Sequence, residues 1–274
     1  MTKSILITGC SSGIGEATAR LFQSKGYRVV ASARHLEDVE RLSQQGFNTV
    51  QLDLNSAESI SQGFTSCLEL LDGTLDAVFH NGAYGQPGAL EDLSVEALRE
   101  QFETNLFGWH ELTRLVIPQM RKQGHGRLIF NSSVLGLVCM PYRGAYNASK
   151  FAIEAYADTL RLELRGSGIA VVLIEPGPID TRFREHAYQA FIRHVAPQLS
   201  AHRHKYQKMI DRLTKVGAAD SFTQGPEMVA VKVLKAVESK RPRRRYYVTL
   251  PTYIFAYLKR LLPTAALDEL LRRG

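Results

Sequence analysis

The stretch Thr8-Gly9-Cys10-Ser11-Ser12-Gly13-Ile14-Gly15 decides the fold. It follows a short apolar run that is typical of a strand, and it leads into a helical pattern. Glycines let the backbone turn tightly and approach a pyrophosphate, which binds the exposed N–H groups of the helix N-terminus. This arrangement predicts the phosphate-binding turn of a dinucleotide site. The candidate binding residues in the turn are Gly9, Ser11, Ser12, Gly13, Ile14 and Gly15.

Strand and helix patterns alternate along the chain. The expected strands are Ser4–Thr8, Tyr27–Ala33, Phe47–Asp53, Leu75–Asn81, Gly126–Ser132, Ile169–Glu175 and Tyr246–Leu250. The expected helices are Gly13–Lys25, Leu36–Gln45, Ala57–Leu70, Val95–Gln123, Ala145–Arg165 and Pro226–Glu238. Repeated β-α units with right-handed crossovers predict an α/β protein of Rossmann type. We expect one domain over residues 1–274, with a doubly wound parallel sheet of about seven strands flanked by helices.

Two later segments depart from this alternation. Residues 182–225 are polar, basic and rich in histidine, with only weak helical patterning. Ligands of open α/β sheets bind beyond the carboxyl ends of the strands, so this insertion is placed to act as a lid. Residues 251–274 carry apolar side chains at helical spacings, which predicts a C-terminal amphipathic segment.

Composition excludes several classes of protein. The 274 residues are 45% hydrophobic and 22% charged, which is typical of soluble globular proteins. The first apolar run is too short for a signal peptide, and no stretch approaches the ~18 apolar residues of a membrane helix. The three widely spaced cysteines, Cys10, Cys67 and Cys139, argue against a disulfide framework and a metal site. A cytoplasmic location is expected.

The formal charge of +7 is unevenly distributed. Residues 1–181 carry a net −5, residues 182–225 a net +5 and residues 226–274 a net +7. No helix-turn-helix, zinc-finger or RNP pattern accompanies the basic residues, so nucleic acid is not an expected partner. The clustered arginines before the amphipathic C-terminal segment leave two readings open. The segment either lies on the anionic inner face of a membrane or packs on protein.

The end of the second strand bears on the choice of dinucleotide. An acidic residue there would bind the ribose 2′-hydroxyl of NAD, whereas an arginine accommodates the 2′-phosphate of NADP. Arg34 stands at this position and Ser11 lies in the preceding turn, so NADP(H) is favoured. Asp53, at the end of the third strand, is a candidate for the adenine edge or a capping carboxylate.

Three residues suit proton transfer to or from a carbinol oxygen. Tyr146 and Lys150 share one helix face through their i, i+4 spacing, and Ser133 ends the preceding strand. A free tyrosine has a pKa of about 10, and a nearby ammonium is expected to lower it. Ser133 is expected to orient the substrate oxygen toward the tyrosine hydroxyl.

Together, the TGxxxGIG turn, a serine thirteen residues before the tyrosine, and YxxxK resemble the short-chain dehydrogenase/reductase family. The resemblance covers essentially the whole chain. It is strongest to the NADP(H)-using hydroxysteroid and retinol dehydrogenase-like branch, bacterial reductases included. The resemblance implies a catalytic triad of Ser133, Tyr146 and Lys150. It implies that Asn105 is a fourth catalytic residue, whose bound water relays protons from Lys150. It also implies a homodimer or homotetramer formed through the long helices Val95–Gln123 and Ala145–Arg165.

The same resemblance implies further cofactor contacts. They are Asn81 and Gly82 after the fourth strand, and Pro176, Gly177, Ile179 and Thr181 near the nicotinamide. The chain departs from the family's NNAG segment, because it reads His80-Asn81-Gly82-Ala83. We expect His80 to be a hydrogen-bonded strand-end residue and Cys10 a small packed side chain.

The substrate side is mostly apolar. The candidate pocket residues are Tyr84, Leu135, Leu137, Val138, Met140, Tyr142 and Phe183. They indicate a small lipophilic aldehyde, ketone or alcohol, and therefore an NADP(H)-dependent oxidoreductase. Two alternatives stay open on the same fold. One is an NADPH-sensing binding protein without turnover, and the other is an enzyme of isomerisation or dehydration.

Overall fold

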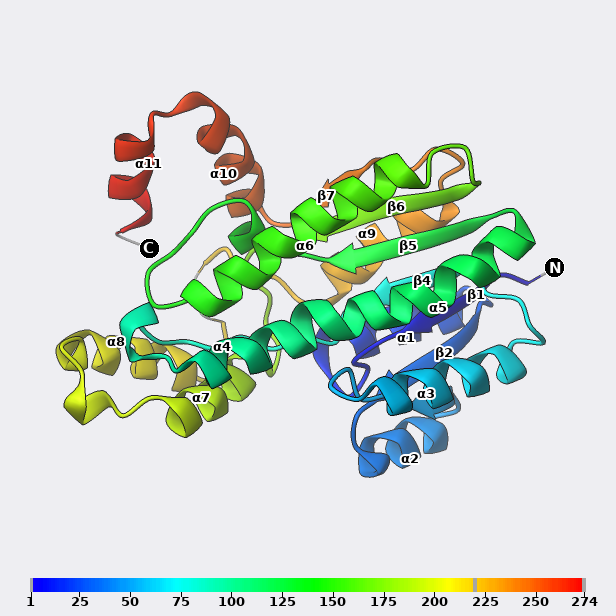
Figure 1. Ribbon diagram of the computed structural model, residues 1–274, viewed down its shortest axis with the longest axis horizontal. Coiled ribbons are helices and arrows are strands. Elements are labelled where there is room, and N and C mark those ends of the chain that lie inside the picture. Colours follow the sequence, from blue (N-terminus) through cyan, green and yellow to red (C-terminus); the bar gives the residue numbers. More distant parts are fainter. Residues whose placement is uncertain (1, 219–220, 273–274) are drawn as a thin grey trace.

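Seven parallel strands form one sheet in the computed structural model, which describes residues 2–218 and 221–272 (Figure 1). The strands are β1 Ser4–Ile7, β2 Arg28–Ala33, β3 Asn48–Gln51, β4 Ala77–His80, β5 Gly126–Asn131, β6 Ile169–Glu175 and β7 Arg245–Tyr247. Their order is β3-β2-β1-β4-β5-β6-β7. The order reverses direction between β1 and β4, so a crevice is expected at the carboxyl ends of these two strands. The predicted seven-stranded Rossmann-type sheet is confirmed.

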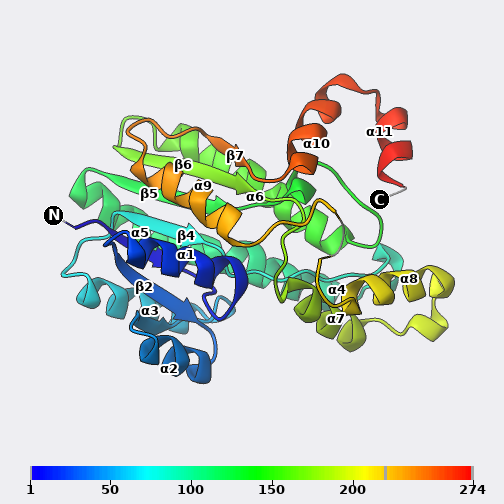
Figure 2. The same ribbon diagram turned by 180° about the vertical axis from the view of Figure 1, so that it is seen from behind.

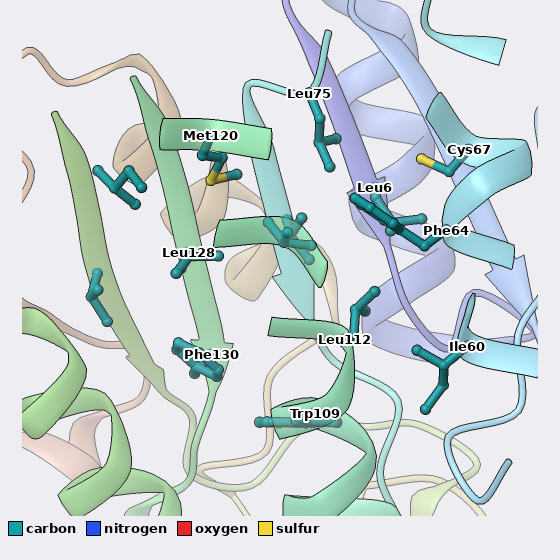
Figure 3. Close-up of a cluster of buried hydrophobic side chains, with 14 of the residues drawn as sticks. Leu6, Ile60, Phe64, Cys67, Leu75, Trp109, Leu112, Met120, Leu128 and Phe130 are labelled. Carbon is teal, nitrogen blue, oxygen red and sulfur yellow. The ribbon is translucent and has the colours of Figure 1, made fainter. Parts of the chain in front are cut away.

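Helices cover both faces of the sheet (Figures 1 and 2). The helices are α1 Gly13–Ser24, α2 Leu36–Gln44, α3 Ala57–Leu70, α4 Val95–Phe102, α5 Gly108–Gln123, α6 Gly144–Glu163, α7 Phe183–His194, α8 Arg203–Thr214, α9 Glu227–Glu238, α10 Leu250–Leu261 and α11 Thr264–Leu271. Alternate residues of β1 face opposite ways, because successive side chains of a strand do so. Leu6 packs toward α3, α5 and α6, whereas Ile5 and Ile7 pack toward α1 and α9. Figure 3 shows the first of these two clusters.

The expected single helix Val95–Gln123 is wrong in one respect. A π-helical turn, Glu103–Phe107, separates α4 from α5. Such a turn holds one extra residue, and it often occurs at functional sites. Here it contains the fully buried Asn105. An apolar pattern of 3.6-residue period does not reveal this insertion.

The expected strand Tyr246–Leu250 is also too long. Strand β7 ends at Tyr247, and α10 begins at Leu250 with Pro251 in its first turn. Proline suits this position, because its fixed φ is already helical and its missing N–H has no helical partner there. The apolar run therefore divides between a strand and a helix.

The predicted lid, residues 182–225, is more helical than expected. Its described residues, which leave out 219 and 220, form α7 and α8 with a short 3-10 turn, Pro197–Leu199, between them. The weak periodicity reflects a small core, in which Phe191 and Tyr206 are the large buried side chains. The lid and the pair α10–α11 lie at the same end of the molecule, where the strands β4, β5 and β6 end (Figure 1).

The C-terminal segment, residues 251–274, consists of two helices, α10 and α11, separated by Leu262 and Pro263, and its last two residues lie outside the described part. Among the described residues, no helix combines the length and apolar character that crossing a membrane requires.

Candidate active site

The glycine-rich turn leaves no room for a side chain at Gly9, Gly13 or Gly15. Gly9 and Gly13 have φ values of +70° and +60°, a region that favours glycine. A Cβ on Gly15 would lie 2.1 Å from the Gly9 carbonyl oxygen, and one on Gly13 would lie 2.9 Å from Thr181 Cγ2. Ser12 is the N-cap of α1, and its side chain makes no capping hydrogen bond. The predicted turn is therefore a close-fitting cradle of bare backbone.

Asn81 fastens this turn to the end of β4. Its Nδ2 donates to the carbonyl oxygens of Thr8 at 2.9 Å and Gly9 at 3.1 Å, and its Oδ1 accepts from Asn131 Nδ2 at 2.9 Å. A Cβ on Gly9 would lie only 2.6 Å from the Gly82 Cα. The glycine of the unusual His80–Ala83 segment thus stands where the two loops touch. Because glycine stands at position 82 and alanine at position 83, no side chain lies in the contact between Gly9 and Gly82.

The segment after β6 closes the same region. The Pro176 carbonyl oxygen accepts a hydrogen bond from Val134 N at 2.7 Å, and Ile179 pairs with Gln224 in an isolated bridge. A Cβ on Gly177 would lie 2.1 Å from Thr249 Oγ1. Since Thr181 lies against Gly13, this segment and the glycine-rich turn form one continuous surface.

Two arginines lie near the end of β2, and only Arg34 is predicted from the sequence as a contact for the cofactor. Arg34 is exposed, and its guanidinium contacts the ring of His35. Arg41, on α2, donates to the Ser11 carbonyl oxygen at 2.6 Å and pairs with Asp38. Arg41 is not predicted from the sequence as part of the site. Its position about one and a half turns into α2 is the one feature that could have pointed to it.

Asp53 shapes the loop between β3 and α3. Its Oδ1 accepts a hydrogen bond from Asn55 N at 3.0 Å, and its own backbone N–H donates to Ser59 Oγ at 2.9 Å. The N-cap of α3 is Ser56, whose side chain accepts from Ser59 N. The alternative role of Asp53 as the helix cap is therefore filled by another residue.

The structure brings Ser133, Tyr146 and Lys150 together. Tyr146 and Lys150 lie one turn apart on α6, and the Lys150 Nζ is 5.5 Å from the centroid of the Tyr146 ring. Ser133, just after β5, hydrogen-bonds Tyr146, and its Oγ accepts from Leu135 N at 3.1 Å. The Lys150 Nζ donates to the Asn131 carbonyl oxygen at 2.7 Å. A phenol, a hydroxyl and an amine thus meet at the carboxyl end of the sheet.

Burial controls the protonation of this group. It raises the pKa of Tyr146 to about 12, and the hydrogen bond with Ser133 offsets this in part. It lowers the pKa of Lys150 to about 7, against the opposing effect of the Glu154 charge. The expectation that Lys150 brings the pKa of Tyr146 below its ordinary value is wrong for this structure, because desolvation of the phenol dominates. Tyr146 holds its proton at neutral pH.

Asn105 connects three elements beside this group. Its Nδ2 donates to the Tyr84 carbonyl oxygen at 2.9 Å and to Ser149 Oγ at 3.1 Å, and its Oδ1 accepts from Tyr84 N at 3.1 Å. The π-helical turn therefore lies close to the loop after β4 and to the residue preceding Lys150.

Two neighbouring predictions are confirmed. His80 is buried at the end of β4 and contacts Thr113 Oγ1 at 3.2 Å, and burial lowers its pKa to about 3. Cys10 is buried, its Sγ donates to the Ile7 carbonyl oxygen, and burial raises its pKa to about 12. A neutral thiol of this kind is a poor nucleophile.

The apolar substrate side divides into two parts. Next to the catalytic group, the Phe183 ring of the lid lies 5.3 Å from the Tyr146 ring. Beyond it, a cavity of about 770 Å³ lies between the loops after β4 and β5 and helix α11. Of the predicted pocket residues, Met140 and Tyr142 line this cavity, and Leu135 and Val138 pack beside Tyr146 and Leu271. Neither Tyr84 nor Leu137 lines it, and nor do the three residues of the catalytic group.

Comparison with known proteins identifies the class. Residues 3–190 match the short chain dehydrogenase family. The chain therefore belongs to the short-chain dehydrogenase/reductase family, and the protein is an oxidoreductase of that family.

Particular relatives agree with this assignment. YbbO of Escherichia coli strain K12, an uncharacterized oxidoreductase, is 43% identical over 272 residues, which cover 99% of this chain and 95% of YbbO. Human retinol dehydrogenase 8 is 32% identical over 253 residues, covering 89% of this chain and 80% of that protein. A short chain dehydrogenase/reductase from Burkholderia phymatum, solved in complex with NAD, superposes with a TM-score of 0.79 at 25% identity. The alignment covers 99% of this chain and 95% of that one.

The role of Asn81 as a clamp can be tested through stability. Asn81→Ala leaves the carbonyl oxygens of Thr8 and Gly9 without their amide donor, and we expect it to lower the free energy of unfolding by about 1–3 kcal/mol. Asn48→Ala, the same change at an exposed position of β3, should cost less than about 0.5 kcal/mol. Urea unfolding measures both, and equal costs would contradict the clamp.

Proposed function

We propose that the protein is an NADP(H)-dependent oxidoreductase that transfers a hydride between nicotinamide and a lipophilic aldehyde, ketone or alcohol. The observation that carries this proposal is the grouping of Ser133, Tyr146 and Lys150 beside the glycine cradle. A proton donor and a carbonyl-orienting hydroxyl are what hydride transfer to a carbonyl requires. Membership of an oxidoreductase family supports the same conclusion.

The residues around the crevice fit a dinucleotide. At Gly9, Gly13 and Gly15 the turn has space only for backbone, which suits the close approach of a pyrophosphate. We assign the adenosine side to Asp53, Asn81 and Gly82. The nicotinamide side is assigned to Pro176, Gly177, Ile179 and Thr181, with Tyr146 and Lys150 facing it. When bound, the dinucleotide supplies the hydride at nicotinamide C4.

The chain's own residues supply the proton and the geometry. Ser133 holds the substrate oxygen by a hydrogen bond, and Tyr146 donates its proton to that oxygen as negative charge develops there. Lys150 returns a proton toward the phenolate, with Asn105 beside it as the start of the path to solvent. Tyr146 is protonated at neutral pH, which is the form that donates a proton to a carbonyl oxygen, and burial raises its pKa further.

The proton-donor role predicts a specific loss. Tyr146→Phe removes the acidic proton while keeping the ring, so we expect NADPH-dependent reduction of a medium-chain aldehyde to fall by about 10²- to 10⁴-fold. The dissociation constant for NADPH should stay within a few-fold of the original value. Tyr156→Phe, the same change on the same helix, is the matched control and should retain activity. Full turnover by Tyr146→Phe would refute the assignment, and tight NADPH binding without turnover in the unmodified chain would favour the sensor alternative.

The cations beside the turn support a preference for NADP(H). Arg34 extends beyond β2, Arg41 fixes the Ser11 backbone, and Arg182 and Arg34 lie close enough to affect the pKa of His186. This surface suits a dianionic 2′-phosphate, which arginine binds through several donors.

Arg34→Ala should raise the KM for NADPH about 10- to 100-fold, because it removes a charge-assisted contact, and should leave the KM for NADH nearly unchanged. Arg28→Ala, at the opposite end of β2, should alter neither value. Steady-state kinetics with both cofactors decides, and a parallel loss with NADH would show that Arg34 does not read the 2′-phosphate.

The apolar surroundings of Tyr146 support a small lipophilic substrate. Phe183 covers one side of the tyrosine, and Met140 and Leu271 join the catalytic group to the 770 Å³ cavity. The resemblance to retinol dehydrogenase 8, named for a lipophilic alcohol, is consistent with this class. We also propose assembly into a homodimer or homotetramer through α4, α5 and α6, which cover the expected helices Val95–Gln123 and Ala145–Arg165. A cytoplasmic location is proposed as well.

Helix α10 supports peripheral contact with a membrane at that location. Its solvent face carries an apolar stripe formed by Leu250, Tyr253, Ile254, Tyr257 and Leu261, all exposed. A basic and aromatic pocket adjoins the stripe, lined by Lys232, Lys235, Arg243, Tyr253 and Tyr257 among others. Two copies facing each other across a two-fold axis would bring like charges together, so an anionic lipid surface is the better partner.

Vesicle binding tests this contact. The full chain should co-sediment with vesicles of phosphatidylcholine and phosphatidylglycerol and dissociate at high salt. The double variant Ile254→Ser, Tyr257→Ser should lose most of the binding, because it removes the centre of the stripe. Leu199→Ser changes an apolar residue of the 182–225 segment that is more exposed than Ile254 and Tyr257, and this variant should bind as before. Equal binding by all three chains would exclude α10 as the contact.

A further inference from the structure

Trp109 is the one tryptophan of the sequence, and it lies directly beneath the catalytic group. It is fully buried in the first turn of α5, immediately after the π-helical turn. The Lys150 Nζ lies 4.7 Å from the centroid of its ring. On its other side, the indole Nε1 donates to the Gly82 carbonyl oxygen at 2.8 Å. One side chain therefore contacts both the lysine and the loop that adjoins the glycine cradle.

A stack of rings fixes the plane of Trp109. The His80 ring stacks on Phe130 at 4.7 Å between centroids and 5° between planes, and both lie within about 6 Å of the indole. Figure 3 shows Trp109 and Phe130 at the same end of the buried cluster. His80, which replaces the usual asparagine of the family's segment, is thus part of the support for the indole.

Lys150 needs such a partner, because its amine is almost entirely removed from water. The Lys150 Nζ donates to the carbonyl oxygen of Asn131 and lies over the rings of Trp109 and Tyr146. An aromatic face attracts an ammonium through the ring quadrupole, and the attraction grows when water is excluded. The neutral amine has no comparable attraction.

We propose that Trp109 is a positioning residue for Lys150, whose indole face holds the lysine in its charged form while the indole N–H fixes the Gly82 carbonyl. The consequence is that a larger fraction of Lys150 carries a proton at neutral pH than burial alone would allow. The inference rests on the proposed role of Lys150 in proton return to Tyr146.

Other charges also act on Lys150 and set the background for the test. Tyr146 and Glu154 face it from α6, and His80 lies beside Trp109 from β4. Arg245 lies behind Glu154. It forms ion pairs with three carboxylates, those of Glu154, Asp158 and Glu175. His80 is neutral through the relevant range, because burial lowers its pKa to about 3. A change of Trp109 leaves each of these groups in place.

Direct titration of Lys150 tests the proposal without turnover. In a chain labelled with ¹³C-lysine, the Lys150 Cε resonance, identified by its loss in Lys150→Arg, is followed between pH 5 and 11. Trp109→Phe keeps an aromatic face and should leave the midpoint within a few tenths of a pH unit. Trp109→Leu should lower it by about one pH unit. Equal midpoints in all three chains, or equal lowering by both substitutions, would overturn the role of the indole face.

If Trp109→Leu fails to fold, tryptophan fluorescence tests the contact between Trp109 and Lys150 with Trp109 in place. The emission of the single tryptophan should change with the midpoint of the Lys150 resonance, and this change should vanish in Lys150→Met. It should persist in Tyr146→Phe. The proposal would be overturned if the emission showed no change at the midpoint of the Lys150 resonance. It would also be overturned if the emission changed with pH in the same way in Lys150→Met. Neither readout depends on catalysis. An inactive enzyme would therefore refute the proposed function, whereas the role of Trp109 is decided by the NMR and fluorescence titrations alone.

Discussion

The contact between Gly9 and Gly82, closed by the amide of Asn81, is the constraint on which the rest of the site depends. It joins the carboxyl ends of β1 and β4, the two strands at which the order of the sheet reverses. With this edge fixed, Thr181 reaches Gly13 from the far side, and the segment after β6 completes the surface. Close backbone approach at Gly9 and Gly82, together with the side chains of Asn81 and Thr181, therefore shapes the cradle.

Burial then determines the chemistry beside that cradle. Exclusion of water disfavours charge on both groups, so Tyr146 stays neutral and Lys150 becomes easy to deprotonate. A neutral phenol is a ready proton donor toward a carbonyl oxygen. The lysine needs compensation if it is to stay charged, and the Trp109 face and the Asn131 carbonyl oxygen supply it. The same low-polarity surroundings support the proposed lipophilic substrate.

Much of this arrangement can be predicted from the sequence. Apolar runs separated by helical patterns give the seven strands, and local spacing gives the turn and the shared face of Tyr146 and Lys150. Contacts between distant segments leave no such trace. The π-helical turn around Asn105, the approach of Arg41 to Ser11 and the place of Trp109 under Lys150 all arise from packing. Burial also arises from packing and does not show in the spacing of residues. The sequence therefore predicts a lowered pKa for Tyr146, whereas burial raises it.

The central claim is that this site moves a hydride to a carbonyl carbon while Tyr146 supplies the proton. The most direct measurement supplies NADPH that carries deuterium at both hydrogen positions of nicotinamide C4, together with a medium-chain aldehyde, and analyses the alcohol by mass spectrometry. The account predicts one deuterium per molecule of alcohol, bound to the carbinol carbon, in step with NADPH consumption. An alcohol without deuterium, or unconsumed NADPH across a series of aldehydes and a steroid ketone, would contradict it.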